Sequence, residues 1–256
     1  MLLVVDVGNT TTQFGIFNGD EYLGSFSCIT KESRTSDELA VFLDRSLAFK
    51  QLRISDITEI IMSSVVPDVN FIMTGTFNRY FNLEPLMVGP GIKTGINIRT
   101  DNPKEVGADR IVDIVSAYTI YGGPAIVANY GTATRFDYVS EEGNFCAAIT
   151  CPGIQISADA LWNKAAKLPK IEILKPDSIF ATTTTTSMQA GLVYGYLGLT
   201  EYIIAQIKKE TGRQDTKVIA CGGYSKLLKD HTDAFDIYDP DLSIKGLKII
   251  NDKNRR

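Results

Sequence analysis

Polar residues that could hold phosphate follow the first apolar stretch of the chain. Residues 2–5 are apolar and lead into Asp6, Gly8, Asn9 and Thr10. A glycine lets the backbone approach a ligand closely, and the amide and hydroxyl side chains supply donors that suit phosphate oxygens. A carboxylate at the end of a strand could also hold Mg²⁺ through water. The same pattern is typical of an ordinary β-hairpin with a polar tip, so this first turn alone leaves both interpretations open.

A similar strand and turn recur about half a chain later. The residues at the end of this second strand and in its turn are Asn129, Gly131, Thr132, Ala133 and Thr134. A spacing of 123 residues aligns Gly8 with Gly131, and it also aligns Asp6 with Asn129 and Thr11 with Thr134. Repetition at this distance suggests two related half-domains rather than a solenoid. Two such turns could clamp a polyphosphate, although chance similarity of two short strands is the alternative.

A third glycine turn follows a third apolar strand, residues 217–221. Here Gly222 and Gly223 open an expected helix. Bare backbone of this kind can lie against a flat base or a ribose. The motif is weak by itself, but it gains weight because it follows the other two turns in order.

The three turns, in this order, resemble the phosphate-1, phosphate-2 and adenosine motifs of the superfamily of sugar kinases, actin and heat-shock chaperones. Within that superfamily the chain is similar to the type III pantothenate kinases, which catalyse the first step of coenzyme A synthesis. The stretches that carry the resemblance are residues 6–10, 89–95, 102–110, 131–134, 165–169 and 187–191. The resemblance implies an α/β fold with duplicated ribonuclease H-like half-domains, each a mixed sheet with flanking helices. We expect these half-domains over residues 1–118 and 119–256.

The resemblance also implies a reaction and its residues. ATP would lie between the half-domains and phosphorylate pantothenate to 4'-phosphopantothenate. Asp109 resembles the catalytic base, which must reach the primary hydroxyl of pantothenate. The residues expected to bind ATP and its phosphates are Asp6, Gly8, Asn9, Thr10, Gly131, Thr132, Ala133, Thr134, Gly222 and Gly223. Those expected to bind pantothenate are Gly107, Ala108, Asp109 and Arg110, together with Thr186 or a neighbouring threonine that reaches across a homodimer.

The resemblance also implies two kinds of bound cation. Asp6 would orient Mg²⁺ through water, and a monovalent cation, K⁺ or NH₄⁺, would lie near Asn129. From the residues alone, Asp109 at a helix start has a structural explanation, because a carboxylate suits the positive end of the helix dipole. Arg110 opposes that dipole, which suggests that it holds a carboxylate or a phosphate.

The sequence departs from the family pattern at four places. Asn129 replaces an aspartate, Arg135 a threonine, Ala147-Ala148 a glycine pair and Thr100 an aromatic residue. Arg135 could substitute for the monovalent cation, which predicts activity without K⁺. Equally, the departures could mark a catalytically weak or inactive relative that binds nucleotide as a regulatory protein. A kinase for another small hydroxylated acid is a third interpretation, because a fold does not determine a substrate.

The composition of the chain argues against several other classes of protein. The 256 residues are 44% hydrophobic, with a net charge of −4 and a pI of about 5.2, so we expect a soluble globular protein and no nucleic-acid partner. The uncharged stretch 114–134 is interrupted by Gly122-Gly123-Pro124, which indicates a buried helix and a core strand rather than a membrane span. Asp6 cuts the first apolar run too short for a signal peptide. The four cysteines show no CxxC spacing, which favours free thiols in the cytoplasm.

Two helices have readable starts. Residues 35–38 carry N-cap chemistry ahead of an apolar face that includes Leu39, Leu43 and Leu47. The five threonines 182–186 predict an irregular linker that ends in an N-cap at Ser187. The helix that follows carries glycines on one face, Gly191, Gly195 and Gly198. Such a face favours a close helix crossing, which could be a dimer contact or internal packing.

Overall fold

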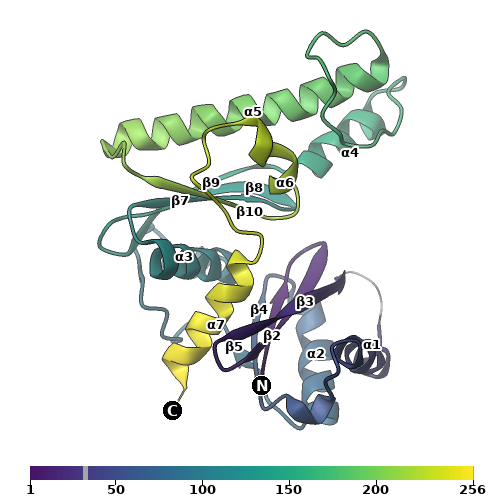
Figure 1. Cartoon of the computed structure of the whole chain (residues 1–256), viewed down its shortest axis with the longest axis vertical. Coiled ribbons are helices and arrows are strands. Elements are labelled where there is room, and N and C mark those ends of the chain that lie inside the picture. The colour runs from purple at the N-terminus through teal and green to yellow at the C-terminus, as the bar shows by residue number, and fades with distance from the viewer. Residues whose placement is uncertain (31–33, 256) are drawn as a thin grey trace. The chain divides into compact units, whose positions relative to one another are not determined.

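The computed structural model describes residues 1–30 and 34–255, and the chain divides into two compact units (Figure 1). Unit 1 comprises Met1–Gly95, Asn102–Ser116 and Leu242–Arg256, and unit 2 comprises Ile96–Asp101 and Ala117–Asp241. The expected division between residues 118 and 119 differs from this one chiefly at the C-terminus. Helix α7 (Leu242–Asn254) packs on β1, β2 and β4, so the end of the chain joins unit 1.

Unit 1 is built on a mixed five-stranded sheet in the order β3-β2-β1-β4-β5. Its strands are β1 (Leu2–Val7), β2 (Thr11–Asn18), β3 (Glu21–Ile29), β4 (Glu59–Ser64) and β5 (Leu86–Met87). The first three form an antiparallel meander, and β4 and β5 continue the sheet in parallel with β1. The carboxyl ends of β1 and β4 therefore meet at one edge of the sheet.

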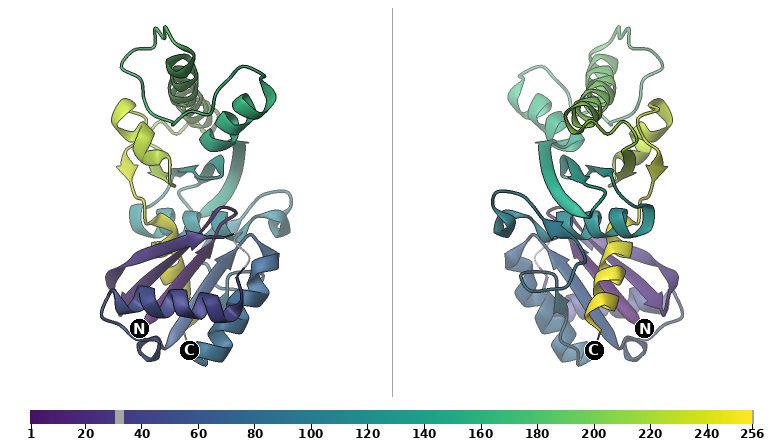
Figure 2. Two further views of the ribbon diagram at one scale, coloured as in Figure 1. Left: turned by 90° about the vertical axis from the view of Figure 1, so that its right-hand side faces the viewer. Right: turned by 90° about the vertical axis from the view of Figure 1, so that its left-hand side faces the viewer.

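Helices cover both faces of this sheet (Figure 2). On one face lie α1 (Ser36–Ala48) and α2 (Pro67–Thr76), the latter continued by a π-helical turn, Phe77–Phe81. The predicted start of α1 is confirmed, because Thr35 and Glu38 form a capping box and the predicted apolar face is buried. On the other face Ile244 of α7 packs so closely on Gly15 that a Cβ there would lie 2.6 Å from its side chain. The start of α3 (Ala108–Tyr121) crosses α7 at Gly246.

Unit 2 holds a six-stranded sheet in the order β11-β10-β7-β8-β9-β6. Its strands are β6 (Asn97–Ile98), β7 (Ala125–Tyr130), β8 (Ala133–Val139), β9 (Asn144–Pro152), β10 (Lys217–Cys221) and β11 (Ile237–Tyr238). Helices α4 (Ile154–Lys164) and α5 (Thr184–Thr211) pack on one face, and the short α6 (Ser225–Leu228) follows β10. The uncharged stretch 114–134 falls in α3 and β7, and among the described residues no helix has the length and apolar character to cross a membrane.

The two sheets are copies of one pattern. The order β3-β2-β1-β4-β5 repeats as β9-β8-β7-β10-β11, with the same parallel and antiparallel neighbours. However, Val7 pairs with Thr12 whereas Tyr130 pairs with Thr134, so the second turn is one residue shorter than the first. The alignment of Thr11 with Thr134 was therefore wrong: the equivalent of Thr134 is Thr12, and both side chains are fully buried.

Helix α5 begins earlier than predicted. Its N-cap is Thr183, whose hydroxyl accepts the backbone N–H of Thr186 at 3.1 Å, and the two residues form a capping box. Most of the threonine run is thus helical rather than a linker, and Ser187 lies inside the helix. Threonine at both positions of the box provides the mutual hydrogen bonds, which a search for an acidic residue three positions after the cap does not find.

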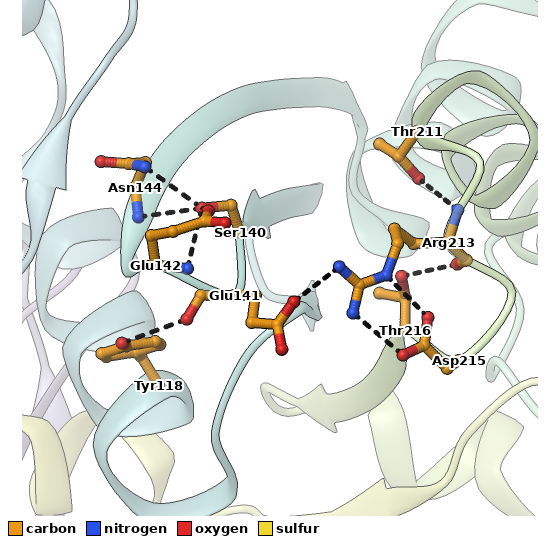
Figure 3. Close-up of polar contacts among 9 residues, drawn as sticks. All are labelled: Tyr118, Ser140, Glu141, Glu142, Asn144, Thr211, Arg213, Asp215 and Thr216. Carbon is orange, nitrogen blue, oxygen red and sulfur yellow. Dashed lines mark hydrogen bonds and ion pairs between the residues drawn. The ribbon is translucent and has the colours of Figure 1, made fainter.

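A polar network joins two loops of unit 2 at the strand ends remote from the second turn (Figure 3). Arg213, after α5, forms a two-pronged ion pair with Asp215, with N–O distances of 2.9 and 3.0 Å, and also contacts Glu141 of the β8–β9 turn at 2.8 Å. These hydrogen bonds raise the pKa of Arg213 and lower that of Asp215. The network ties the C-terminal end of α5 to the β8–β9 hairpin.

Candidate active site

The first turn lies at the carboxyl end of β1 and is held tightly. The Gly8 N–H donates to the Thr11 carbonyl at 3.2 Å, and the Thr10 carbonyl accepts from the Thr30 N–H at 2.9 Å. Asp6 is half-buried, whereas Asn9 and Thr10 are exposed. The turn therefore presents an amide and a hydroxyl side chain to solvent, next to a carboxylate anchored in the sheet.

Unit 1 brings the segment Gly107–Arg110 to the same edge of the sheet. The Val65 N–H, just after β4, donates to the Val7 carbonyl at 3.1 Å. The Val65 side chain in turn lies 3.8 Å from the position that a Cβ of Gly107 would take. Val65 thus contacts both the end of β1 and the residue before α3. The predicted base Asp109 therefore lies in the same unit as Asp6.

Gly107 makes room for the Asp109 carboxylate. A Cβ at Gly107 would lie 2.5 Å from Asp109 Oδ1, closer than two such atoms can approach. That same Oδ1 accepts the backbone N–H of Arg110 at 2.9 Å. The Gly107 carbonyl accepts from the N–H groups of Arg110 and Ile111, so Gly107 also caps the helix. The sequence analysis assigned Gly107 to pantothenate; this positioning role was missed, although a glycine two residues before the acid is a readable signal.

The second turn and the glycine pair 222–223 come together in unit 2. The Asn129 side chain lies against both: its Oδ1 would be 3.3 Å from a Cβ of Gly131 and 2.6 Å from one of Gly222. Gly222 adopts a φ of +87°, which favours glycine, and the Tyr224 N–H donates to the Tyr130 carbonyl at 3.0 Å. The expected phosphate and nucleoside segments of this unit are therefore adjacent.

Gly153 packs directly against the second turn, a role that the sequence did not predict. A Cβ at this position would lie 2.1 Å from the Thr132 carbonyl oxygen. The backbone at the start of α4 therefore packs directly on the turn. Thr132 in the turn is exposed, whereas Thr134 at the start of β8 is fully buried.

Thr186 has its hydroxyl engaged within α5. It lies 2.8 Å from the Thr183 hydroxyl and also contacts the Thr183 backbone N–H and carbonyl, both at 3.2 Å. Thr184 and Thr185 are exposed, whereas Thr186 is half-buried. The capping role accounts for Thr186, and the exposed neighbours are better placed to meet a ligand.

The donor groups suit Mg²⁺ better than a monovalent cation. Asp6 offers one half-buried carboxylate, and Mg²⁺ commonly takes one or two carboxylates, with phosphate and water oxygens completing its shell. No cluster of three or more His, Cys, Asp or Glu side chains with metal-binding geometry occurs within residues 1–30 and 34–255. At the second turn Asn129 is neutral, so the fit there is poor.

A family model described as type III pantothenate kinase matches residues 2–206. A curated relative from Agathobacter rectalis, named type III pantothenate kinase, is 50% identical over 256 residues, which cover 100% of this chain and 98% of the relative. The chain belongs to the type III pantothenate kinase family. The predicted family is therefore confirmed, and the prediction of a kinase with it.

Solved structures share the fold at low identity. A putative Baf family transcriptional activator from Campylobacter jejuni has a TM-score of 0.58 at 21% identity, with 98% of each chain covered. A putative 2-dehydro-3-deoxygalactonokinase from Sinorhizobium meliloti has a TM-score of 0.57 at 12% identity, covering 98% of this chain and 96% of that one. An activator of 2-hydroxyisocaproyl-CoA dehydratase from Clostridium difficile, with bound ADPNP, scores 0.55 at 11% identity, covering 98% and 95%. These likenesses concern the fold alone, and they agree with the predicted ribonuclease H-like class.

Proposed function

We propose that this protein transfers the γ-phosphoryl group of ATP to pantothenate, giving 4'-phosphopantothenate and ADP in the first step of coenzyme A synthesis. Membership of the type III pantothenate kinase family supports this reaction. The observation that carries the mechanism is the position of Asp109 near the first turn, where Gly107 leaves room for its carboxylate and the Arg110 N–H donates to it. A carboxylate there suits deprotonation of a substrate hydroxyl.

Phosphoryl transfer depends mainly on positioning and on stabilising charge. In our proposal Gly8, Asn9 and Thr10 hold phosphate oxygens with backbone and side-chain donors. The exposed Thr132, with the backbone of Gly131 and Ala133, does the same from the second turn, and Gly222-Gly223 borders the nucleoside. Asp6 would hold Mg²⁺, which supplies electrostatic stabilisation of the phosphate charge when bound.

Asp109 acts as the general base in this proposal. Its carboxylate accepts the proton of the primary hydroxyl of pantothenate, and the oxygen's electron pair forms the new bond to the γ-phosphorus. The bond from that phosphorus to the β,γ-bridging oxygen breaks, and ADP leaves with the electron pair. Arg110, next along α3, is proposed to hold the carboxylate of pantothenate, because a guanidinium pairs well with a carboxylate.

The exposed face of α5 supports a homodimer. Ser187, Gly191, Gly195, Gly198, Tyr202 and Ala205 lie along one exposed stripe of this 28-residue helix. A Cβ added at any of the three glycines would meet no atom of the described chain within 4 Å, so internal packing does not explain them. We propose that two copies cross here and, as the family resemblance implies, that a threonine near the start of α5 reaches the partner's substrate. Thr184 or Thr185, rather than Thr186, would then be the threonine that reaches pantothenate.

The cytoplasm is the proposed location, which agrees with the free thiols of Cys28, Cys146, Cys151 and Cys221. A monovalent cation, K⁺ or NH₄⁺, belongs to the activity implied by the family resemblance. Asn129 would offer such a cation an amide oxygen but no negative charge.

The test of the proposed function is ADP release by purified protein with Mg-ATP and pantothenate, with 4'-phosphopantothenate identified by mass spectrometry. Pantothenol, which lacks the carboxylate, is the matched substrate. We expect turnover that requires pantothenate, a strong preference for pantothenate over pantothenol, and loss of that preference in Arg110→Ala. Nucleotide binding without pantothenate-dependent turnover would contradict the proposal and favour the regulatory alternative.

A further inference from the structure

One row of side chains crosses the unit 2 sheet beside the second turn. In this row Arg135 on β8 pairs directly with Asn129 on β7 and with Thr150 on β9, and Asn129 pairs with Cys221 on β10. Directly opposed residues point to the same face, with Cβ atoms about 5 Å apart. Arg135 is only 8% exposed. A largely buried arginine is therefore the direct strand neighbour of the position where the family pattern has an aspartate.

The two repeats carry opposite charges at this place. Asp6 pairs with Gln13 in unit 1 as Asn129 pairs with Arg135 in unit 2. Each first member lies two residues before the turn glycine, and each second member follows the buried threonine, Thr12 or Thr134. The first pair carries one negative charge and the second carries one positive charge. The first turn thus suits a metal cation, and the second suits an anion such as phosphate.

The second turn is a poor host for a monovalent cation. Asn129 supplies a neutral oxygen that already lies over Gly131 and Gly222, and the next side chain in the row is a guanidinium. The carboxylate nearest in sequence on this face is Asp137, two residues along β8 and fully buried. Arg135 and Asp137 lie two residues apart on the same face of β8 and carry opposite charges, so K⁺ would gain no net negative charge from the pair.

We propose that Arg135 supplies, as part of the chain, the positive charge that a monovalent cation supplies at the second turn in the family pattern. The kinase reaction then needs Mg²⁺ but neither K⁺ nor NH₄⁺. The activity measurement that tests this inference rests on the proposed function. Nucleotide binding and thermal stability are two further readouts that do not require the protein to be a kinase.

The experiment uses the full-length wild-type chain in chloride salts of K⁺, NH₄⁺, Na⁺ and tetramethylammonium at equal ionic strength. The readouts are pantothenate-dependent ADP release, the Kd of Mg-ADP and the Tm. We expect all three to agree across the four salts, with kcat/KM for ATP and the Kd within about twofold. Activation by K⁺ or NH₄⁺ of tenfold or more would overturn the inference while leaving the proposed function intact.

Absence of pantothenate-dependent turnover in every salt would instead contradict the proposed function. The inference is then decided by binding: a K⁺-specific gain in Mg-ADP affinity or Tm contradicts it, and equal values in the four salts support it. The two failures are therefore distinguishable.

Variants test the same point in the opposite direction. The double variant Asn129→Asp, Arg135→Thr restores the family pattern, and we expect it to gain activation by K⁺ of tenfold or more. Arg135→Lys keeps the charge and should remain independent of K⁺. Arg135→Gln should weaken Mg-ADP binding about tenfold. If a variant at this buried position fails to fold, the wild-type salt comparison still decides. A double variant that folds and stays indifferent to K⁺ would contradict the inference.

Discussion

Replacing Gly107 with alanine should displace the carboxylate of Asp109, the proposed catalytic base, with little effect on folding. The new Cβ would lie 2.5 Å from Asp109 Oδ1. A non-bonded carbon and oxygen need about 3.2 Å or more, so the carboxylate must move by roughly 0.7 Å. A misplacement of about 1 Å can cost about 100-fold in rate. We therefore expect kcat/KM for pantothenate to fall by about 10- to 100-fold, which corresponds to about 1.4–2.7 kcal/mol.

The cost of this substitution to stability should be small. The φ of Gly107 lies outside the left-handed region, so alanine can adopt the backbone conformation. Glycine is the better residue at a helix N-cap, and alanine there costs about 1 kcal/mol or less. For a chain of this size that shifts the Tm by about 2–4 °C at most. The Kd of Mg-ADP should stay within twofold, because in the proposed reaction the displaced carboxylate acts on pantothenate and not on the nucleotide.

Steady-state kinetics with ATP saturating, together with thermal unfolding by circular dichroism, make the assay. Gly75→Ala is the matched control. Gly75 lies in α2, and a Cβ there would lie an ordinary 3.4 Å from Oγ of Ser36 in α1. The control should keep wild-type kcat/KM. If Gly107→Ala is folded and also retains activity within twofold of the wild type, the reasoning that Gly107 positions Asp109 for catalysis is wrong.

Three further expectations concern stability and the remote network. Burial and a 2.8 Å hydrogen bond to Asp239 raise the pKa of Tyr121 from 10.0 to about 12. The protonated phenol therefore stabilises the fold fully below pH 10, and this contribution is lost as the pH rises toward 12. Tyr121→Phe should have a lower free energy of unfolding than the wild type at pH 8, measured by urea unfolding. The difference between the two proteins should narrow above pH 10, and a difference that stays constant with pH would contradict this. Thr183→Ala removes the α5 cap and should cost about 1 kcal/mol, lowering the Tm by about 2–4 °C, and an unchanged Tm would refute the capping role. Arg213→Ala breaks the network of Figure 3 and should leave kcat/KM within twofold, because that network lies at the strand ends remote from the second turn; a tenfold loss would show that the two are coupled.

Local patterns predicted the parts of the fold that depend on neighbouring residues. Strands β1 and β7 end at Val7 and Tyr130, one residue after the predicted Asp6 and Asn129, and the capping box at Thr35 and the glycine pair after β10 lie where the sequence indicates. Turns and caps are predictable in this way because short-range hydrogen bonds determine them. The predicted start of α5 was wrong. Any residue of the threonine run could cap a helix, and only the hydrogen bonds between Thr183 and Thr186 identify the one that does.

Long-range packing could not be predicted from a single sequence. Helix α7 joins unit 1 because Ile244 fits over Gly15, two residues more than two hundred positions apart. The alignment of the repeats was wrong by one residue after the turn, because sequence similarity does not reveal a turn of different length. The sequence already indicated that Arg135 could replace the monovalent cation, and the strand register adds that Arg135 lies directly opposite Asn129. The roles of the site residues remain predictions.

The most direct test of the central claim, that Asp109 is the base of an ATP-dependent pantothenate kinase, compares Asp109→Asn with the wild type. Phosphoryl transfer to pantothenate and the Kd of Mg-ADP are measured on the same preparations. Loss of a general base costs about 10²- to 10⁴-fold, so we expect kcat to fall by at least 100-fold while the Kd stays within twofold. Turnover within tenfold of the wild type, with nucleotide still bound, would contradict the account.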